Sequence, residues 1–154
     1  MMNAQALGTS KSDDFKPQNS KSFETFEGIE IDQMYREHIL DHYRNPRNKG
    51  KLQGLHFHDK NPLCGDEIDI YALVQDGTLR NISFEGNGCA VSQASASILT
   101  EYVKGKKADE ITSMGREEME ELLGITVSVM RVKCMMLALV ALKKLLRGVT
   151  NGHA

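Results

Sequence analysis

Residues 86–97, "GNGCAVSQASAS", place a cysteine directly after two glycines and before a run of alanines and serines. Residues 79–85 show the apolar alternation of a strand, and after Cys89 the apolar residues recur at helical spacing as far as Gly105. The stretch therefore predicts a strand that leads through a glycine-rich loop into a helix. The small side chains predict that this helix packs closely against its neighbours.

The remaining pattern predicts an α+β fold, in which a small antiparallel three-stranded sheet packs against several helices. Apolar residues alternate with polar ones over 67–75, the Asp76-Gly77 pair predicts a hairpin turn after them, and a short strand is expected around Leu55 and Phe57. Helices are expected near 33–45, 108–113, 115–123 and 129–147.

The 154 residues suit one domain with one hydrophobic core. Residues 1–30 are polar and have no apolar period, so they are predicted to form a disordered tail. Residues 31–149 are predicted to form the single folded domain, and residues 150–154 a flexible C-terminus.

Charge and hydropathy argue against three classes of protein: nucleic-acid-binding, membrane-spanning and secreted. A formal net charge of −2 argues against nucleic-acid binding, which needs a basic face. No apolar run is long enough for a membrane span, and the N-terminus lacks the apolar core of a secretory signal. We therefore expect a cytoplasmic protein that binds neither nucleic acid nor membrane. Cysteines stay reduced in that compartment, which favours metal binding or catalysis over disulfide bonding for the three present.

The three cysteines all fall at predicted element ends, where functional sites are usually built. Cys64 lies in the turn "NPLCGD", Cys89 at the expected helix N-terminus, and Cys134 in "MRVKC" at the start of the last helix. Asp66 follows Cys64 across a flexible glycine. Three thiolates and one carboxylate give four donors, enough for tetrahedral zinc or an iron–sulfur cluster. Any one of these cysteines alone could equally be a buried small apolar residue.

Local charges also bear on the thiols. The helix dipole and the glycine backbone favour a thiolate at Cys89. Lys133 is adjacent to Cys134, and Arg131 lies three residues earlier on the same helical face. Nearby cations are expected to lower the pKa of the Cys134 thiol.

Several stretches together resemble the U-type iron–sulfur assembly proteins SufU, IscU and the N-terminal domain of NifU. These are "YREHILDHYRNPRNKG", "NPLCGDEI", "GNGCAVSQASAS" and "RVKC", which occur in the family's order within about residues 33 to 147. The phrase "MRVKC" is nearest to SufU, because IscU usually has a histidine at the position of Lys133. The short spacing between Cys89 and Cys134 resembles IscU instead, so the resemblance leaves the subtype open.

The resemblance implies a scaffold or sulfur-transfer protein rather than a classical enzyme. Its metal site would consist of Cys64, Asp66, Cys89 and Cys134, holding zinc or a transient [2Fe–2S] cluster. Cys134 would accept persulfide sulfur from a SufS-like cysteine desulfurase. Lys133 and Arg131 would help to hold the thiolate anion, and Arg131 would also contact the desulfurase. A downstream cluster carrier or apo-protein would then receive the product.

Two rival functions remain open from the residues alone. One is a binding module whose zinc is purely structural, and the other is a hydrolase with Cys89 as its nucleophile, which would need a histidine base. His38 and His42, four residues apart on one predicted helix, are a weaker candidate for a second metal pair. His56 and His58 are predicted to point outward from a strand.

Overall fold

The computed structural model describes residues 23–26 and 29–149, and side chains from Tyr35 onward. It contains two antiparallel three-stranded sheets and five helices. In chain order the elements are β1 (Phe23–Phe26), β2 (Ile29–Asp32), α2 (Gln33–Arg44), β3 (Leu55–Asn61), β4 (Asp66–Gln75), β5 (Thr78–Asn87), α3 (Ala90–Val103), α4 (Ala108–Thr112), α5 (Arg116–Leu123), β6 (Ile125–Val127) and α6 (Val129–Gly148).

The larger sheet is a meander of β3, β4 and β5, as predicted. Asp76 and Gly77 both have positive φ, which is the conformation of a type I′ hairpin turn between β4 and β5. In the hairpin of β3 and β4, Asn61 pairs with Asp66. The four residues between them form the turn that carries Cys64.

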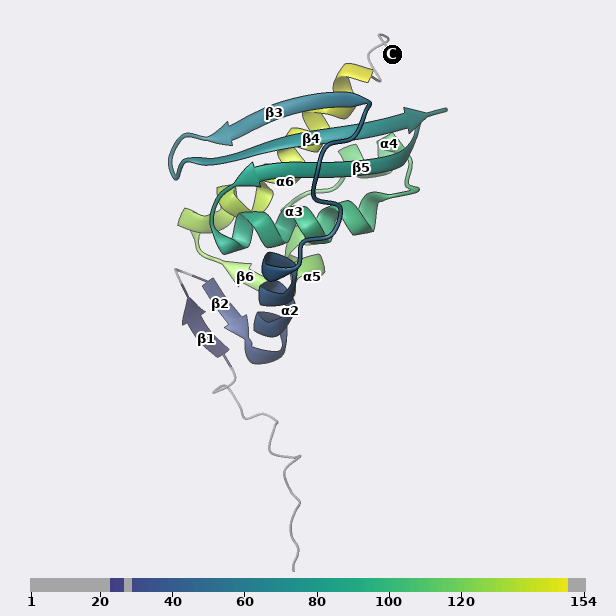
Figure 1. Ribbon diagram of the computed structural model, residues 1–154. Coiled ribbons are helices and arrows are strands. Elements are labelled where there is room, and N and C mark those ends of the chain that lie inside the picture. The colour runs from purple at the N-terminus through teal and green to yellow at the C-terminus, as the bar shows by residue number, and fades with distance from the viewer. Residues whose placement is uncertain (1–22, 27–28, 150–154) are drawn as a thin grey trace, which may run out of the picture.

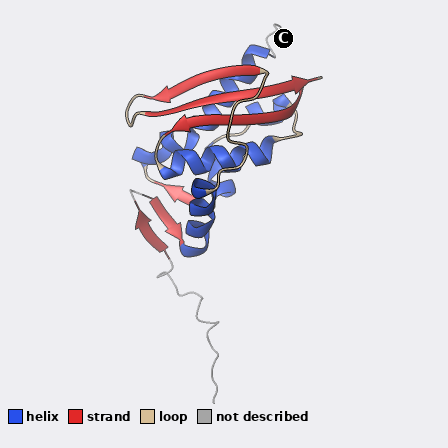
Figure 2. Ribbon diagram, in the orientation of Figure 1, coloured by secondary structure: helices blue, strands red, loops and turns tan. Residues whose placement is uncertain are grey.

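Helices α3 and α6 cover one face of this sheet, and α2 packs on the other side of α3 (Figure 1). The core contains few aromatic side chains, and Phe84 is its largest fully buried one. The run Ala94, Ser95, Ala96 and Ser97 is fully buried in α3, so the prediction that small residues let this helix pack closely is confirmed. Figure 2 shows this layer of helices in blue against the red strands of the sheet.

The smaller sheet, in the order β1-β2-β6, was not predicted. Strand β1 and residues 29–30 of β2 fall within the predicted 1–30 tail. Strand β1 pairs with β2, and β2 in turn pairs with the three-residue strand β6 between α5 and α6. The alternation of Ile29 and Ile31 with Glu30 and Asp32 is a short strand signal that the prediction missed. The pairing with β6 has no local signal, because β6 lies nearly a hundred residues further along the chain. The prediction for residues 1–22 and 150–154 falls outside the described residues.

His42 links α2 to α3. Its Nδ1 lies 2.7 Å from the Oγ of fully buried Ser97, which also accepts a hydrogen bond from the backbone N–H of Arg47. The ring contacts that of His38 edge-on, and Nε2 lies 3.8 Å from a carboxylate oxygen of Glu101. These contacts engage both ring nitrogens of His42 in the packing of the fold, which argues against the predicted metal pair with His38.

Acidification should weaken the fold through His42. Burial lowers the pKa of His42, and the charges of Arg47 and His38 lower it further, against the opposing carboxylates of Glu101 and Asp41. The contribution of His42 is therefore complete above the unfolded pKa of about 6.5 and is lost as pH falls through the lower folded value. Thermal melts between about pH 7.5 and 5.5 should show a steeper loss of stability in the wild type than in His42→Gln. His38→Gln, one turn away, should stay close to the wild type; equal slopes for all three proteins would contradict the assignment.

Candidate metal centre

Two of the cysteines and Asp66 form a compact group at one end of the larger sheet. The Sγ atoms of Cys64 and Cys134 are 3.4 Å apart, and one donor atom each from Cys64, Asp66 and Cys134 lie within 4.8 Å of one another. All three cysteines are free thiols, and the sulfur separation is far above the disulfide bond length of about 2.05 Å. Two thiolates on a tetrahedral zinc lie about 3.8 Å apart, so the spacing suits a shared ion.

Cys89 contacts this group at Asp66. Cys89 is the N-cap residue of α3, as predicted, and its backbone N–H donates to Asp66 Oδ1 at 3.2 Å. Its Sγ lies 3.7 Å from Asp66 Oδ2, although it stands outside the compact group of three. Asp66 is only 4% exposed. A buried carboxylate beside three sulfurs is a costly arrangement unless a cation shares it, so the donor set fits zinc or another thiophilic metal.

Gly88 leaves the space that the Asp66 carboxylate occupies. A Cβ at this position would come 2.8 Å from Asp66 Oδ1 and would also collide with the hydroxyl of Ser92. A larger residue here would force the Asp66 carboxylate or Ser92 to move. The group that approaches Gly88 is itself a metal-ligand candidate.

The turn that carries Cys64 is organised by Asn61. The Nδ2 of Asn61 donates to Cys64 Sγ at 3.0 Å, and its Oδ1 accepts the backbone N–H of Leu63 at 3.1 Å. The backbone carbonyl of Asn61 accepts the N–H of Gly65 at 2.8 Å, and Gly65 has a φ of +79°. Asn61 was not among the predicted site residues, although the Asn-Pro pair before Cys64 is a visible turn signal in the sequence.

Burial, which the sequence did not reveal, has the largest effect on the pKa of the Cys134 thiol. Burial raises the pKa of Cys134, and the hydrogen bond with Cys64 and the charge of Cys89 raise it further. The Nη1 of Arg131 lies 3.8 Å from Cys134 Sγ and lowers the pKa, as expected, but burial outweighs it. Lys133 is exposed beside the centre and lines a hollow next to Asn61. Its predicted role is not tested by this geometry.

Three large apolar side chains on the segments that carry Cys64 and Cys134 are exposed. Leu63, next to Cys64, is 80% exposed, and Val129 and Met130, at the start of α6, are 84% and 83% exposed. Cys64 itself is exposed, whereas Cys134 is 1% exposed. Exposed large apolar residues are typical of an interaction site, and these three lie on the turn that carries Cys64 and at the start of the helix that carries Cys134.

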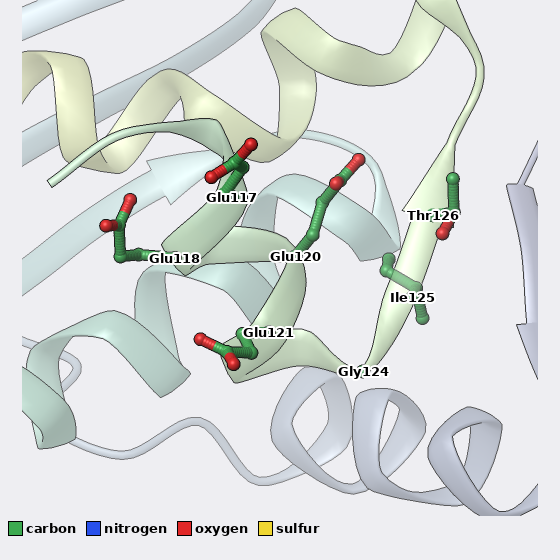
Figure 3. Close-up of a pocket in the computed structure, with 7 residues that line it drawn as sticks. All are labelled: Glu117, Glu118, Glu120, Glu121, Gly124, Ile125 and Thr126. Carbon is green, nitrogen blue, oxygen red and sulfur yellow. The ribbon is translucent and has the colours of Figure 1, made fainter.

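The other candidates form no metal centre within the described part of the chain. His56 and His58 point outward, as predicted, and both contact Asp69, at 2.7 and 3.2 Å. A hollow of about 480 Å³ lies elsewhere, along α5 and β6 (Figure 3). It is lined by four glutamates with Gly124, Ile125 and Thr126, and it contains no cysteine or histidine. We therefore place the candidate site at the cysteines and not at this hollow.

Comparison with known proteins decides the family. Residues 34–150 match the NifU-like N-terminal domain. This chain belongs to that family. The NifU-like domain is 37% identical to the zinc-dependent sulfurtransferase SufU of Bacillus subtilis over 132 residues, which cover 74% of this chain and 90% of the relative. It is 36% identical to the iron–sulfur cluster assembly scaffold protein IscU of Thermotoga maritima, covering 77% of this chain and 96% of that one.

A solved structure agrees with the fold. The crystal structure of FiSufU from Fervidobacterium islandicum matches this NifU-like domain with a TM-score of 0.63 at 28% identity, covering 74% of this chain and 97% of that one. The resemblance to SufU, IscU and NifU is thus confirmed, and so is the α+β fold with a three-stranded antiparallel sheet. No helix among the described residues is both long and apolar enough to cross a membrane.

Proposed function

We propose that this NifU-like domain serves iron–sulfur cluster assembly by accepting persulfide sulfur from a cysteine desulfurase at a metal centre of three cysteines and one aspartate. The observation that carries the proposal is the gathering of two sulfurs and a carboxylate within 4.8 Å, with the third sulfur 3.7 Å from that carboxylate. The names of the relatives, a zinc-dependent sulfurtransferase and cluster scaffolds, support the same chemistry.

Cys64, Asp66, Cys89 and Cys134 would hold zinc, or a [2Fe–2S] cluster in a scaffold role. A bound cation would supply the positive charge that keeps the cysteine sulfurs deprotonated. That charge matters most for Cys134, because burial alone raises the pKa of its thiol.

The proposed sulfur transfer is a thiol–disulfide exchange. The Cys134 sulfur attacks the terminal sulfur of the donor's persulfide, forming a new S–S bond while the bond within the donor breaks. The donor cysteine leaves as a thiolate and takes up the proton released from Cys134, so there is no net oxidation. Arg131 lies 3.8 Å from Cys134 Sγ and is placed to stabilise its negative charge, and Lys133 provides a second cation nearby.

Access to Cys134 requires the start of α6 and the turn that carries Cys64 to move apart. Cys134 is almost fully buried, and the exposed Cys64 lies against it. The exposed apolar residues Leu63, Val129 and Met130 offer a docking surface through which a desulfurase would separate the two segments. Cys64 is consequently the alternative acceptor, because a donor would meet it first.

The test is sulfur transfer to the full chain. The zinc-loaded protein is incubated with a cysteine desulfurase and cysteine, digested without reductant and mapped by mass spectrometry. We expect an added sulfur atom, about 32 Da, on the peptide containing Cys134. An adduct confined to Cys64 would move the acceptor role to that residue, and no adduct on any cysteine would overturn the proposal. The rival function, a purely structural zinc site, predicts this last result together with zinc that does not exchange.

A further inference from the structure

We propose that Asn61 is a positioning residue that keeps Cys64 bound to the metal through an N–H···S hydrogen bond. This inference rests on the proposed metal centre and assigns different roles to two of its cysteines. Cys64 would be the retained ligand and Cys134 the sulfur that leaves the metal, although Cys64 is the more exposed of the two.

The orientation of the Asn61 amide follows from its partners. A backbone N–H only donates, so the atom that faces the N–H of Leu63 must be the amide oxygen. The NH₂ group then faces Cys64 Sγ, at 3.0 Å, which is short for a hydrogen bond to sulfur. The Asn61 side chain spans the turn and contacts both the backbone and the sulfur.

The position of Asn61 makes this contact rigid. Asn61 is 5% exposed, ends β3 and pairs with Asp66 at the start of β4, so the same pair of strand ends fixes one metal-ligand candidate and orients another. A neutral donor to a metal-bound sulfur withdraws electron density from it without adding charge. Such a bond makes the sulfur a weaker nucleophile toward electrophiles while it stays in the coordination shell.

The alternative is that Asn61 only shapes the turn through its oxygen. Asn61→Asp separates the two roles, because aspartate has the same shape and keeps an oxygen for the N–H of Leu63 but has no donor for Cys64. Asn61→Ala loses both contacts. Asn81→Asp is a matched control: Asn81 lies on β5, and its Oδ1 accepts the backbone N–H of Ile82, with no sulfur contact among the described hydrogen bonds.

Two measurements on the purified full chain test this inference. The first is zinc affinity by competition with a chromophoric chelator, and the second is the rate at which iodoacetamide modifies Cys64 in the zinc-loaded protein, measured by peptide mass spectrometry. We expect Asn61→Asp and Asn61→Ala both to lose about tenfold or more in zinc affinity and to expose Cys64 to faster alkylation. Asn81→Asp should behave as the wild type. Circular dichroism confirms that each variant is folded.

The outcomes separate this inference from the function on which it rests. Zinc affinity in Asn61→Asp that equals or exceeds that of Asn81→Asp, with only Asn61→Ala weakened, would reduce Asn61 to a turn former and overturn the inference. The proposed metal centre would survive that result. A wild-type protein that takes up no zinc or iron would overturn the centre and the inference together.

Discussion

Cys134→Ser should accept no detectable sulfur from a cysteine desulfurase. The proposed acceptor is the sulfur atom itself, and a serine hydroxyl at neutral pH is protonated and forms no persulfide. We expect a loss of at least about 100-fold in sulfur incorporation, since replacement of a covalent acceptor removes the step and does not merely slow it. The measurement is the amount of added sulfur per chain after a fixed incubation, by mass spectrometry of the intact protein without reductant.

Cys64→Ser is the matched control for that variant. It also removes one candidate metal ligand, so both variants should bind zinc more weakly, but it leaves Cys134 in place. Sulfur incorporation should remain measurable in Cys64→Ser and be absent from Cys134→Ser. The reverse pattern would assign the acceptor role to Cys64, and equal incorporation in both variants would point to Cys89.

Gly88→Ala should weaken zinc binding by about 10- to 100-fold, the range seen when groups that orient metal ligands are disturbed. The added methyl group would meet the Asp66 carboxylate at 2.8 Å and the Ser92 hydroxyl even more closely, so Asp66 must move. Gly88 does not have a positive φ, and the expected effect is therefore steric and not conformational. Competition with a chromophoric chelator measures the affinity directly.

Gly148→Ala provides the control for the glycine substitution. Gly148 lies at the end of α6, where an added Cβ would meet no atom within 4 Å. Its zinc affinity should equal that of the wild type. Unchanged affinity in Gly88→Ala as well would mean that Asp66 is not a ligand or that its position is not restricted by Gly88.

Local sequence patterns predicted the larger sheet and the long helices because their signals lie within each segment. Alternation predicted the strand at 67–75, observed as Asp66–Gln75, and the apolar helical period predicted 129–147, observed as Val129–Gly148. The smaller sheet was missed because its stability depends on pairing between residues 29–31 and 125–127. Nothing in either short segment indicates its distant partner.

For the candidate site, the sequence predicted which residues lie close together but not their burial or their hydrogen bonds. Cys64, Asp66, Cys89 and Cys134 were identified from residue type, position at element ends and resemblance, and the fold brings them together. The effect of burial on Cys134 could not be foreseen, because charges are visible in the sequence and burial is not. Asn61 was missed for a related reason: its contact with Cys64 exists only once the turn after β3 is formed.

Zinc K-edge X-ray absorption of the zinc-loaded full chain tests most directly whether residues from three separate segments share one ion. We predict a four-coordinate shell of three sulfurs at about 2.3 Å and one oxygen at about 2.0–2.2 Å, with the oxygen contribution changed in Asp66→Ala. A shell composed only of nitrogen and oxygen, or one with a single sulfur, would contradict the account.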